Sequence, residues 1–172
     1  MNRTVIQLLV ILVTISGSAV AQLLDVQISV APKKIDQQKG RKGEHSTVTT
    51  KEMAYTVMVE NRSLKTFDEL KVKYMIFYAD SQPGRRDKPI EAHHKGSETL
   101  RNLSTHRKAQ FETAPFKLEK EELDGGWFYS SGGDGRARDR VTGVWVRAYA
   151  DGNLVGEYAN PSTVTKNREW ED

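Results

Sequence analysis

The most clearly patterned part of the chain is GVWVRAYADGNLVGEYANPSTV, residues 143–164. It contains two runs in which apolar and polar side chains alternate, joined across Asp151-Gly152. Asp-Gly between alternating runs is typical of a tight hairpin, because a type I′ turn requires a positive φ at both central residues. The stretch therefore predicts two antiparallel strands.

The register of this hairpin decides which side chains share a face. A two-residue turn places Trp145 opposite Tyr158, and gathers Trp145, Tyr149 and Tyr158 on one face together with Arg147. A three-residue turn would instead place Arg147 opposite Glu157, but it puts the glycine in the middle of the turn rather than at the left-handed third position. We favour the two-residue turn.

Alternating patterns recur along the rest of the chain. In KEMAYTVMVEN, residues 51–61, Met53, Tyr55, Val57 and Val59 fall on one face, which predicts a strand with a buried side. The other expected strands are 24–30, 70–80, 98–103, 108–113 and a short one at 127–130, and 119–123 is expected to form a helical turn. Short strands with turn signals between them predict an all-β protein, a single antiparallel immunoglobulin-like β-sandwich of about seven to eight strands.

The chain begins MNRTVIQLLVILVTISGSAVAQ, which has the pattern of a secretory signal peptide. Arg3 is the only charge before an apolar run at 5–15, and small residues precede Gln22. The apolar run is much shorter than the ~20 residues that a membrane-spanning helix needs. We therefore expect residues 1–21 to be removed and the protein to be exported, without a stable membrane anchor, to a bacterial periplasm or the exterior.

The expected mature chain is one domain, residues 22–165, followed by a polar tail at 166–172. The sequence contains no cysteine, which excludes a disulfide framework, a thiolate metal site and lipid attachment through cysteine. Removal of Arg3 leaves 25 basic residues (26 minus 1) against 23 acidic ones, so no global field favours nucleic acid as a partner. The basic segment 32–43 and the acidic segment 119–124 are interpreted as solvated loops. The alternative for the basic segment is contact with an acidic cell-surface polymer.

No catalytic or metal-binding motif is present. The four histidines include the adjacent pair His93 and His94, which are interpreted as loop residues and which on a strand would point to opposite faces. Neither G-x-S-x-G nor H-E-x-x-H occurs, and the glycine-rich segment 131–139 is interpreted as a flexible connection. We expect no enzyme activity, no metal and no cofactor.

The aromatic side chains are the remaining candidates for binding. Trp145, Tyr149 and Tyr158 with Arg147 either hold the sheet together or present a flat surface for sugar rings or a partner protein. Burial is the favoured interpretation, because large aromatic side chains are mostly buried. The candidate binding residues are Trp145, Arg147, Tyr149 and Tyr158, with Trp127 and Tyr129 as a second set.

The sequences GVWVRAYADGNLVGEYANPS and YTVMVENRSLKTFDELKVKYMIFY resemble those of uncharacterised secreted bacterial proteins with an immunoglobulin-like or fibronectin type III-like sandwich. The resemblance covers most of the expected mature chain and implies the fold rather than an activity. The Cys, Trp, Cys spacing of antibody domains is missing, so the strand order stays open.

The sequence thus favours a non-enzymatic protein with a structural, assembly or protein-binding role at the bacterial envelope, acting through an edge strand or a sheet face. The partner is expected to be an envelope or extracellular protein. The first alternative is a carbohydrate-binding module that holds a polysaccharide on the aromatic face. The second is a small hydrolase in which His94 or His106 meets a carboxylate in a cleft.

Overall fold

The computed structural model describes residues 24–81, 89–130, 132 and 135–170. The expected signal peptide, residues 82–88, part of the glycine-rich segment and the last two residues of the tail lie outside the described residues. No helix within the described part is long and apolar enough to cross a membrane.

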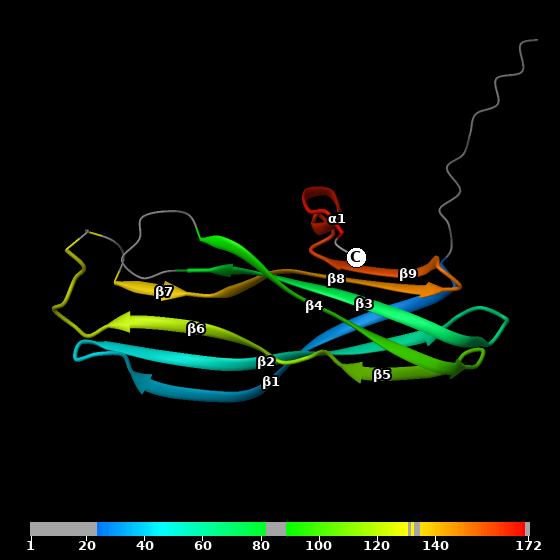
Figure 1. Cartoon of the computed structure of the whole chain (residues 1–172), viewed down its shortest axis with the longest axis horizontal. Helices are drawn as coiled ribbons and strands as arrows, with labels where there is room; N and C mark the ends of the chain where they lie inside the picture. Colours follow the sequence, from blue (N-terminus) through cyan, green and yellow to red (C-terminus); the bar gives the residue numbers. More distant parts are fainter. Residues whose placement is uncertain (1–23, 82–88, 131, 133–134, 171–172) are drawn as a thin grey trace, which may run out of the picture.

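The described residues form nine strands in two antiparallel sheets, together with one short helix (Figure 1). The five-stranded sheet has the order β1-β2-β6-β7, and β5 also pairs with β2; the four-stranded sheet has the order β4-β3-β8-β9. This confirms the expected all-β antiparallel sandwich, with nine strands in place of seven or eight. The elements are β1 (Val26–Arg41), β2 (Ser46–Asn61), β3 (Phe67–Asp80), β4 (Ile90–Leu103), β5 (Lys108–Glu112), β6 (Phe116–Leu123), β7 (Arg136–Arg138), β8 (Arg140–Ala150), β9 (Asn153–Asn160) and α1 (Val164–Asn167).

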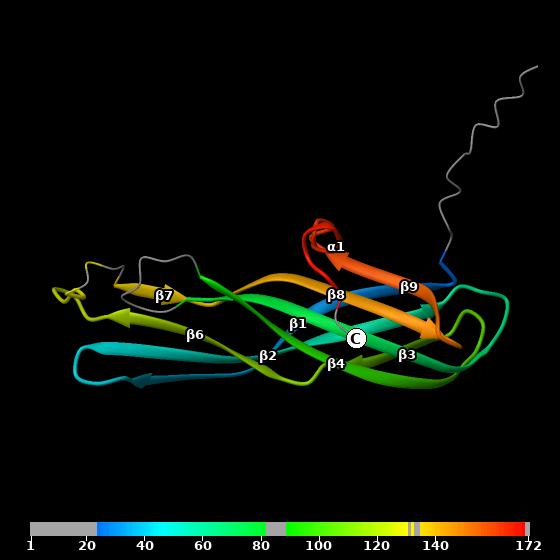
Figure 2. The ribbon, with the colours of Figure 1, turned by 45° about the horizontal axis from the view of Figure 1, so that its top comes forward.

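The main core lies between the two sheets, in the half of the molecule that contains β5 and β9 (Figures 1 and 2). The alternation in the sequence predicted its composition correctly, since Tyr55, Val57 and Val59 of β2 are buried on one face. Leu70 and Val72 of β3 meet them from the other sheet and are fully buried. Burial of such side chains contributes about 1.5–3 kcal/mol each.

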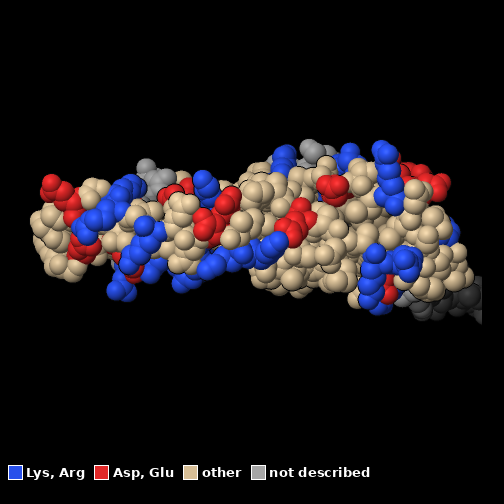
Figure 3. Space-filling model, turned by 90° about the horizontal axis from the view of Figure 1, so that it is seen from below, with Lys and Arg blue, Asp and Glu red and all other residues tan. Residues whose placement is uncertain are grey.

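The five-stranded sheet continues beyond this core as an extension that we call the arm (Figure 1). The arm consists of residues 32–41 of β1, residues 46–53 of β2, all of β6 and all of β7. The β1 part of the arm is exposed throughout. In the space-filling view of Figure 3 the narrow end of the molecule carries Lys and Arg side chains with acidic ones among them.

The structure corrects three expectations in this half of the molecule. The basic segment was expected to be a loop, but it is strand as far as Arg41, and 119–123 forms part of β6 rather than a helical turn. Residues 127–130, expected to be a strand, are not one. Pairing with β2 explains the first two differences, because a neighbouring strand supplies hydrogen bonds that a polar sequence does not itself specify.

The outer edge of β1 is irregular. Pro32 has no N–H to offer, Lys33 and Lys34 follow it, and the register shifts between Lys34 and Asp36, which leaves Ile35 without a partner on β2. These features weaken the edge as a place where another strand can pair.

A bulge also changes the hairpin formed by β8 and β9. Tyr149 opposes Leu154, as the two-residue turn requires, but the register shifts between Ala148 and Tyr149. Beyond the shift, Trp145 opposes Ala159 and not Tyr158. The expected pairing of Trp145 with Tyr158 was therefore wrong, because one additional residue on β9 moves every following side chain to the other face.

The outer face of the four-stranded sheet has its own small core. Trp145, Met75, Phe77 and Val164 are buried together there, and Trp170 packs against them. The segment that contains α1 covers this face beside β8 and β9 (Figure 2). Gly143 makes the close approach possible, since a Cβ atom there would lie 2.5 Å from Cγ2 of Val164.

Candidate functional site

Trp145 does not face solvent. It is 3% exposed, and its Nε1 donates a hydrogen bond to Oε1 of Glu157 at 3.0 Å. Nε of Arg147 donates to the same oxygen at 2.7 Å, and the Arg147 guanidinium lies 4.4 Å from the Trp145 ring centroid and 4.7 Å from that of Trp170. The favoured interpretation of Trp145 as a buried residue is confirmed.

The other members of the expected aromatic face are separated from Trp145 or partly covered. Tyr158 packs against the main core between the sheets, on the opposite side of the four-stranded sheet from Trp145. Tyr149 is half-buried, and Nζ of Lys73 lies 5.6 Å from its ring centroid. The residues Trp145, Arg147, Tyr149 and Tyr158 therefore do not form one ligand-binding face.

The second aromatic set lies at the end of the arm. Trp127 is 54% exposed and stacks on His45 with ring centroids 3.6 Å apart. The hydroxyl of Tyr129 donates to Oε1 of Glu121 at 3.5 Å, and burial, with Glu121 beside it, raises the pKa of Tyr129. Trp127 and Tyr129 thus contact the connection between β1 and β2 and strand β6, rather than the core.

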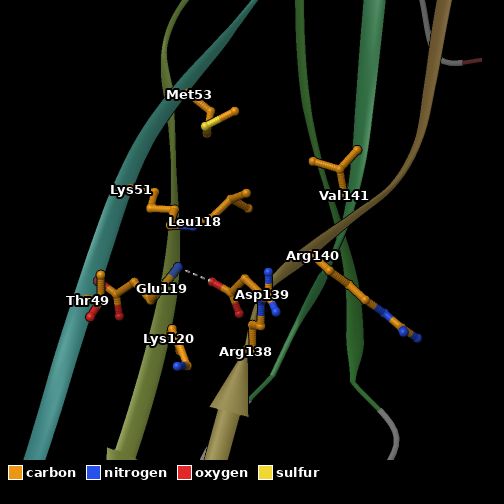
Figure 4. A pocket seen from close by; sticks show the side chains of 10 residues that line it. All are labelled: Thr49, Lys51, Met53, Leu118, Glu119, Lys120, Arg138, Asp139, Arg140 and Val141. Carbon is orange, nitrogen blue, oxygen red and sulfur yellow. Dashed lines mark hydrogen bonds between the residues drawn. The ribbon is translucent and has the colours of Figure 1, made fainter. Parts of the chain in front are cut away.

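A cleft of about 440 Å³ opens where the arm leaves the sandwich, with β2 and β6 on one side and the junction of β7 and β8 on the other (Figure 4). This volume is within the ~300–1,000 Å³ that ligand pockets usually have. The residues that line the cleft are Thr49, Lys51, Met53, Leu118, Glu119, Lys120, Arg138, Asp139, Arg140 and Val141.

Strand pairing places basic side chains of the arm on one face. One row crosses four strands: Lys39 of β1 opposes Thr49, Thr49 opposes Lys120 of β6, and Lys120 opposes Arg138 of β7. Side chains two residues apart on a strand share a face. Lys51 of β2 and Arg136 of β7 therefore lie on the same side of the sheet as this row, one in each of the two rows that flank it. We call Lys39, Lys51, Lys120, Arg136 and Arg138 the cationic face.

Three acidic residues lie near these five cations: Glu122 on the same face, and Glu119 and Asp139 in the lining of the cleft. Glu122 accepts from Lys120 at 2.8 Å and lies 3.6 Å from Nε of Arg136. The hydrogen bond from Lys120 is the main reason that the pKa of Glu122 is lowered, and Arg136 and Lys39 add to the effect. Within the described part of the chain, Lys39, Lys51 and Arg138 make no ion pair, so their charges are available to a ligand.

Of the two acidic residues in the cleft, Asp139 joins the two sheets. Its Oδ2 accepts from the backbone N–H of Glu119 at 2.8 Å, and its Oδ1 accepts from the backbone N–H of Ser81 at 3.0 Å. Its own N–H donates to the carbonyl of Glu119 at 2.8 Å. The side chain thus connects β6 with the end of β3 where the chain passes from β7 to β8.

We expect Asp139→Ala to lower the free energy of unfolding by about 2 kcal/mol, because two charge-assisted hydrogen bonds to backbone amides are lost. Urea unfolding followed by circular dichroism measures the change. Asp139→Asn is the matched control, since an amide oxygen keeps one acceptor, and it should lose about half as much. An Asp139→Ala variant as stable as wild type would contradict a joining role.

The histidines stand apart from this cleft. His93 and His94 lie on β4, not in a loop, and being consecutive on a strand they point to opposite faces, as expected for that case. Nε2 of His94 lies 3.1 Å from the carbonyl oxygen of Ala114. No group of three or more potential metal ligands occurs among the residues that the structure describes.

The sequence did not identify the cationic face, because its members come from four strands and only the pairing registers bring them together. One signal was present: Arg136, Arg138 and Arg140 alternate with other residues, as do Lys39 and Arg41. Alternating cations in an extended segment indicate that the charges share a face. That signal has meaning only once the segments are known to be strands.

The comparisons with known proteins identify no family for this chain. Neither a family model nor a curated protein matches it. Among solved structures, ApaA from Bordetella pertussis is 9% identical, over 79% of this chain and 92% of that one, with a TM-score of 0.40. A protein from Akkermansia muciniphila is 15% identical over 78% and 70%, with a TM-score of 0.31. A further structural-genomics target is 8% identical over 86% and 96%, with a TM-score of 0.37.

Proposed function

We propose that this protein is a non-catalytic binding protein of the bacterial envelope or exterior, and that its cationic face holds a negatively charged polymer. The observation that carries the proposal is the row of Lys39, Lys120 and Arg138 across four strands, two of whose members make no ion pair within the described residues. The export that this proposal includes is supported by the signal-peptide pattern at residues 1–21. Membership among secreted immunoglobulin-like proteins is part of the same proposal, supported by the sandwich.

The spacing of the charges favours a polymer over a small anion. Neighbouring strands lie about 4.8 Å apart, so the row from Lys39 to Arg138 extends over about 14 Å. A single small anion contacts one or two of these side chains. A polymer of linked charges contacts all of them and releases counterions that had been condensed along the polymer, which favours association.

The same features argue against the two other modes of contact expected from the sequence. Pro32, the lysines after it and the bulge disfavour strand addition along β1. Sugar binding on Trp145 requires an exposed ring, whereas this ring is covered. We therefore prefer the face of the arm to its edge as the binding surface. The charged side chains, rather than the aromatic ones, are the groups expected to contact the ligand.

We expect the triple variant Lys39→Gln/Lys51→Gln/Arg138→Gln to bind dextran sulfate about tenfold or more weakly than wild type in dilute salt. Each lost cation removes one charge contact, and a tenfold change corresponds to about 1.4 kcal/mol. The dependence of the binding constant on salt should also become less steep. Isothermal titration calorimetry at several salt concentrations measures both, and uncharged dextran should not bind.

The matched control is Lys65→Gln/Lys71→Gln/Lys166→Gln, which removes the same charge from exposed positions outside the arm. It should bind dextran sulfate nearly as well as wild type. If both triple variants weaken binding equally, only net charge matters and the cationic face is not the site. If wild type does not bind dextran sulfate, the proposed function fails.

A further inference from the structure

The cleft combines charge with an apolar surface. Met53 of β2 and Leu118 of β6 line one side of it, and Val141 of β8 lines the other (Figure 4). All three are partly buried and pack against the main core, so they form a fixed apolar floor rather than mobile surface side chains. Four basic residues line the same cleft beside this floor, Lys51, Lys120, Arg138 and Arg140, together with the acidic residues Glu119 and Asp139.

This combination discriminates between classes of anionic polymer. Proteins that hold single-stranded nucleic acid stack its bases on aromatic side chains, and none of the described residues lining the cleft is aromatic. Inorganic polyphosphate is charged throughout and gains nothing from an apolar floor. A polymer of acidic sugars has both parts, because its rings carry C–H faces and its carboxylates project from them.

We infer that the ligand is an acidic polysaccharide whose ring faces cover Met53, Leu118 and Val141 while its carboxylates reach Lys51, Lys120 and Arg138. This inference rests on the proposed function and specifies the class of polymer. Arg138 offers a planar pair of donors that matches a carboxylate, and the two lysines supply compact positive charges. Thr49, which lies between Lys39 and Lys120 in the row, has a hydroxyl able to bond to sugar hydroxyls.

Covering the floor contributes affinity that charge alone does not. Apolar surface removed from water contributes about 25 cal/mol per Å², independently of salt. An acidic polysaccharide should therefore keep part of its affinity when salt screens the cations, whereas a ligand held only by charge should not.

The test measures how tightly the full-length protein binds three oligomers of equal charge: oligogalacturonate, linear polyphosphate and oligothymidylate. Titration calorimetry at physiological salt should show oligogalacturonate binding about tenfold more tightly than the other two. Fully methyl-esterified oligogalacturonate, which keeps the rings and loses the charge, should bind at least tenfold more weakly than the acid form. Polyphosphate or oligothymidylate binding as tightly as oligogalacturonate overturns the inference but leaves the proposed function standing. Failure of all three oligomers to bind overturns both.

Two variants separate the floor from the charges. Leu118→Thr removes apolar surface from the floor and should weaken oligogalacturonate binding about fivefold while polyphosphate binding stays unchanged. Lys51→Gln should weaken both. Thermal unfolding establishes that each variant is folded, and Val141→Thr replaces Leu118→Thr if the latter is not. Equal weakening of both ligands by the floor variants overturns the inference, because the floor would then have no preference for sugar.

Discussion

Replacing Trp145 with alanine is expected to lower the free energy of unfolding by about 3–5 kcal/mol. The ring is 3% exposed and packs with Met75 and Phe77 on the outer face of the four-stranded sheet. The change leaves a cavity beneath Trp170, whose ring centroid lies 5.0 Å from that of Trp145. It also removes one of the two rings that contact the Arg147 guanidinium.

Urea unfolding followed by far-ultraviolet circular dichroism measures this loss. Trp127→Ala is the matched control, because that ring is 54% exposed and its main aromatic contact is His45; it should cost less than about 1 kcal/mol. Similar losses for the two variants would mean that Trp145 contributes no more to folding than a surface residue does.

Replacing Asn61 with alanine is expected to cost about 3 kcal/mol. Asn61 is 0% exposed, and its Nδ2 donates to the carbonyls of Lys65 and Leu103 at 2.8 and 2.9 Å. Its Oδ1 accepts from the backbone N–H and the hydroxyl of Ser63 at 2.9 and 2.8 Å. The variant leaves these groups without their partner, and each buried polar group left unpaired costs about 1–3 kcal/mol.

Thermal and urea unfolding of Asn61→Ala measure the loss, and Asn153→Ala provides the comparison. Asn153 is exposed and makes one long hydrogen bond, at 3.3 Å to the carbonyl of Asp151, so its replacement should change stability by less than about 0.5 kcal/mol. A loss below 1 kcal/mol for Asn61→Ala would show that its hydrogen bonds contribute little net stability.

The sequence predicted the core far better than the arm. In β2 the side chains Tyr55, Val57 and Val59 alternate with less apolar ones, so their burial follows from the period of a strand. The β1 part of the arm is polar on both faces and has no such period. It is a strand because β2 pairs with it along its length. Such pairing between two segments cannot be inferred from the composition of either segment alone.

The candidate site was less predictable for a related reason. A regular two-residue turn predicts that Trp145 and Tyr158 share one aromatic face. One bulged residue in β9 instead places them on opposite sides of the sheet. A bulge is a local change in strand pairing that the alternation of side chains does not specify. Close packing lies beside this one, since at Gly156 a Cβ atom would lie 2.9 Å from the carbonyl oxygen of Val26. Such a contact between distant strands becomes visible only in three dimensions.

The irregular edge of β1 has a consequence for how densely these molecules can be gathered. A polymer with many repeats brings many copies of its binding protein to a high local concentration, where long open strands tend to join and grow into fibrils. Pro32, the adjacent lysines and the bulge at Ile35 interrupt the longest such strand. At the other edge of the same sheet, β7 has only three residues, so few backbone groups there can pair with a strand of another molecule. If the protein binds a repeating polymer as proposed, these features disfavour strand pairing between neighbouring molecules along β1 and β7.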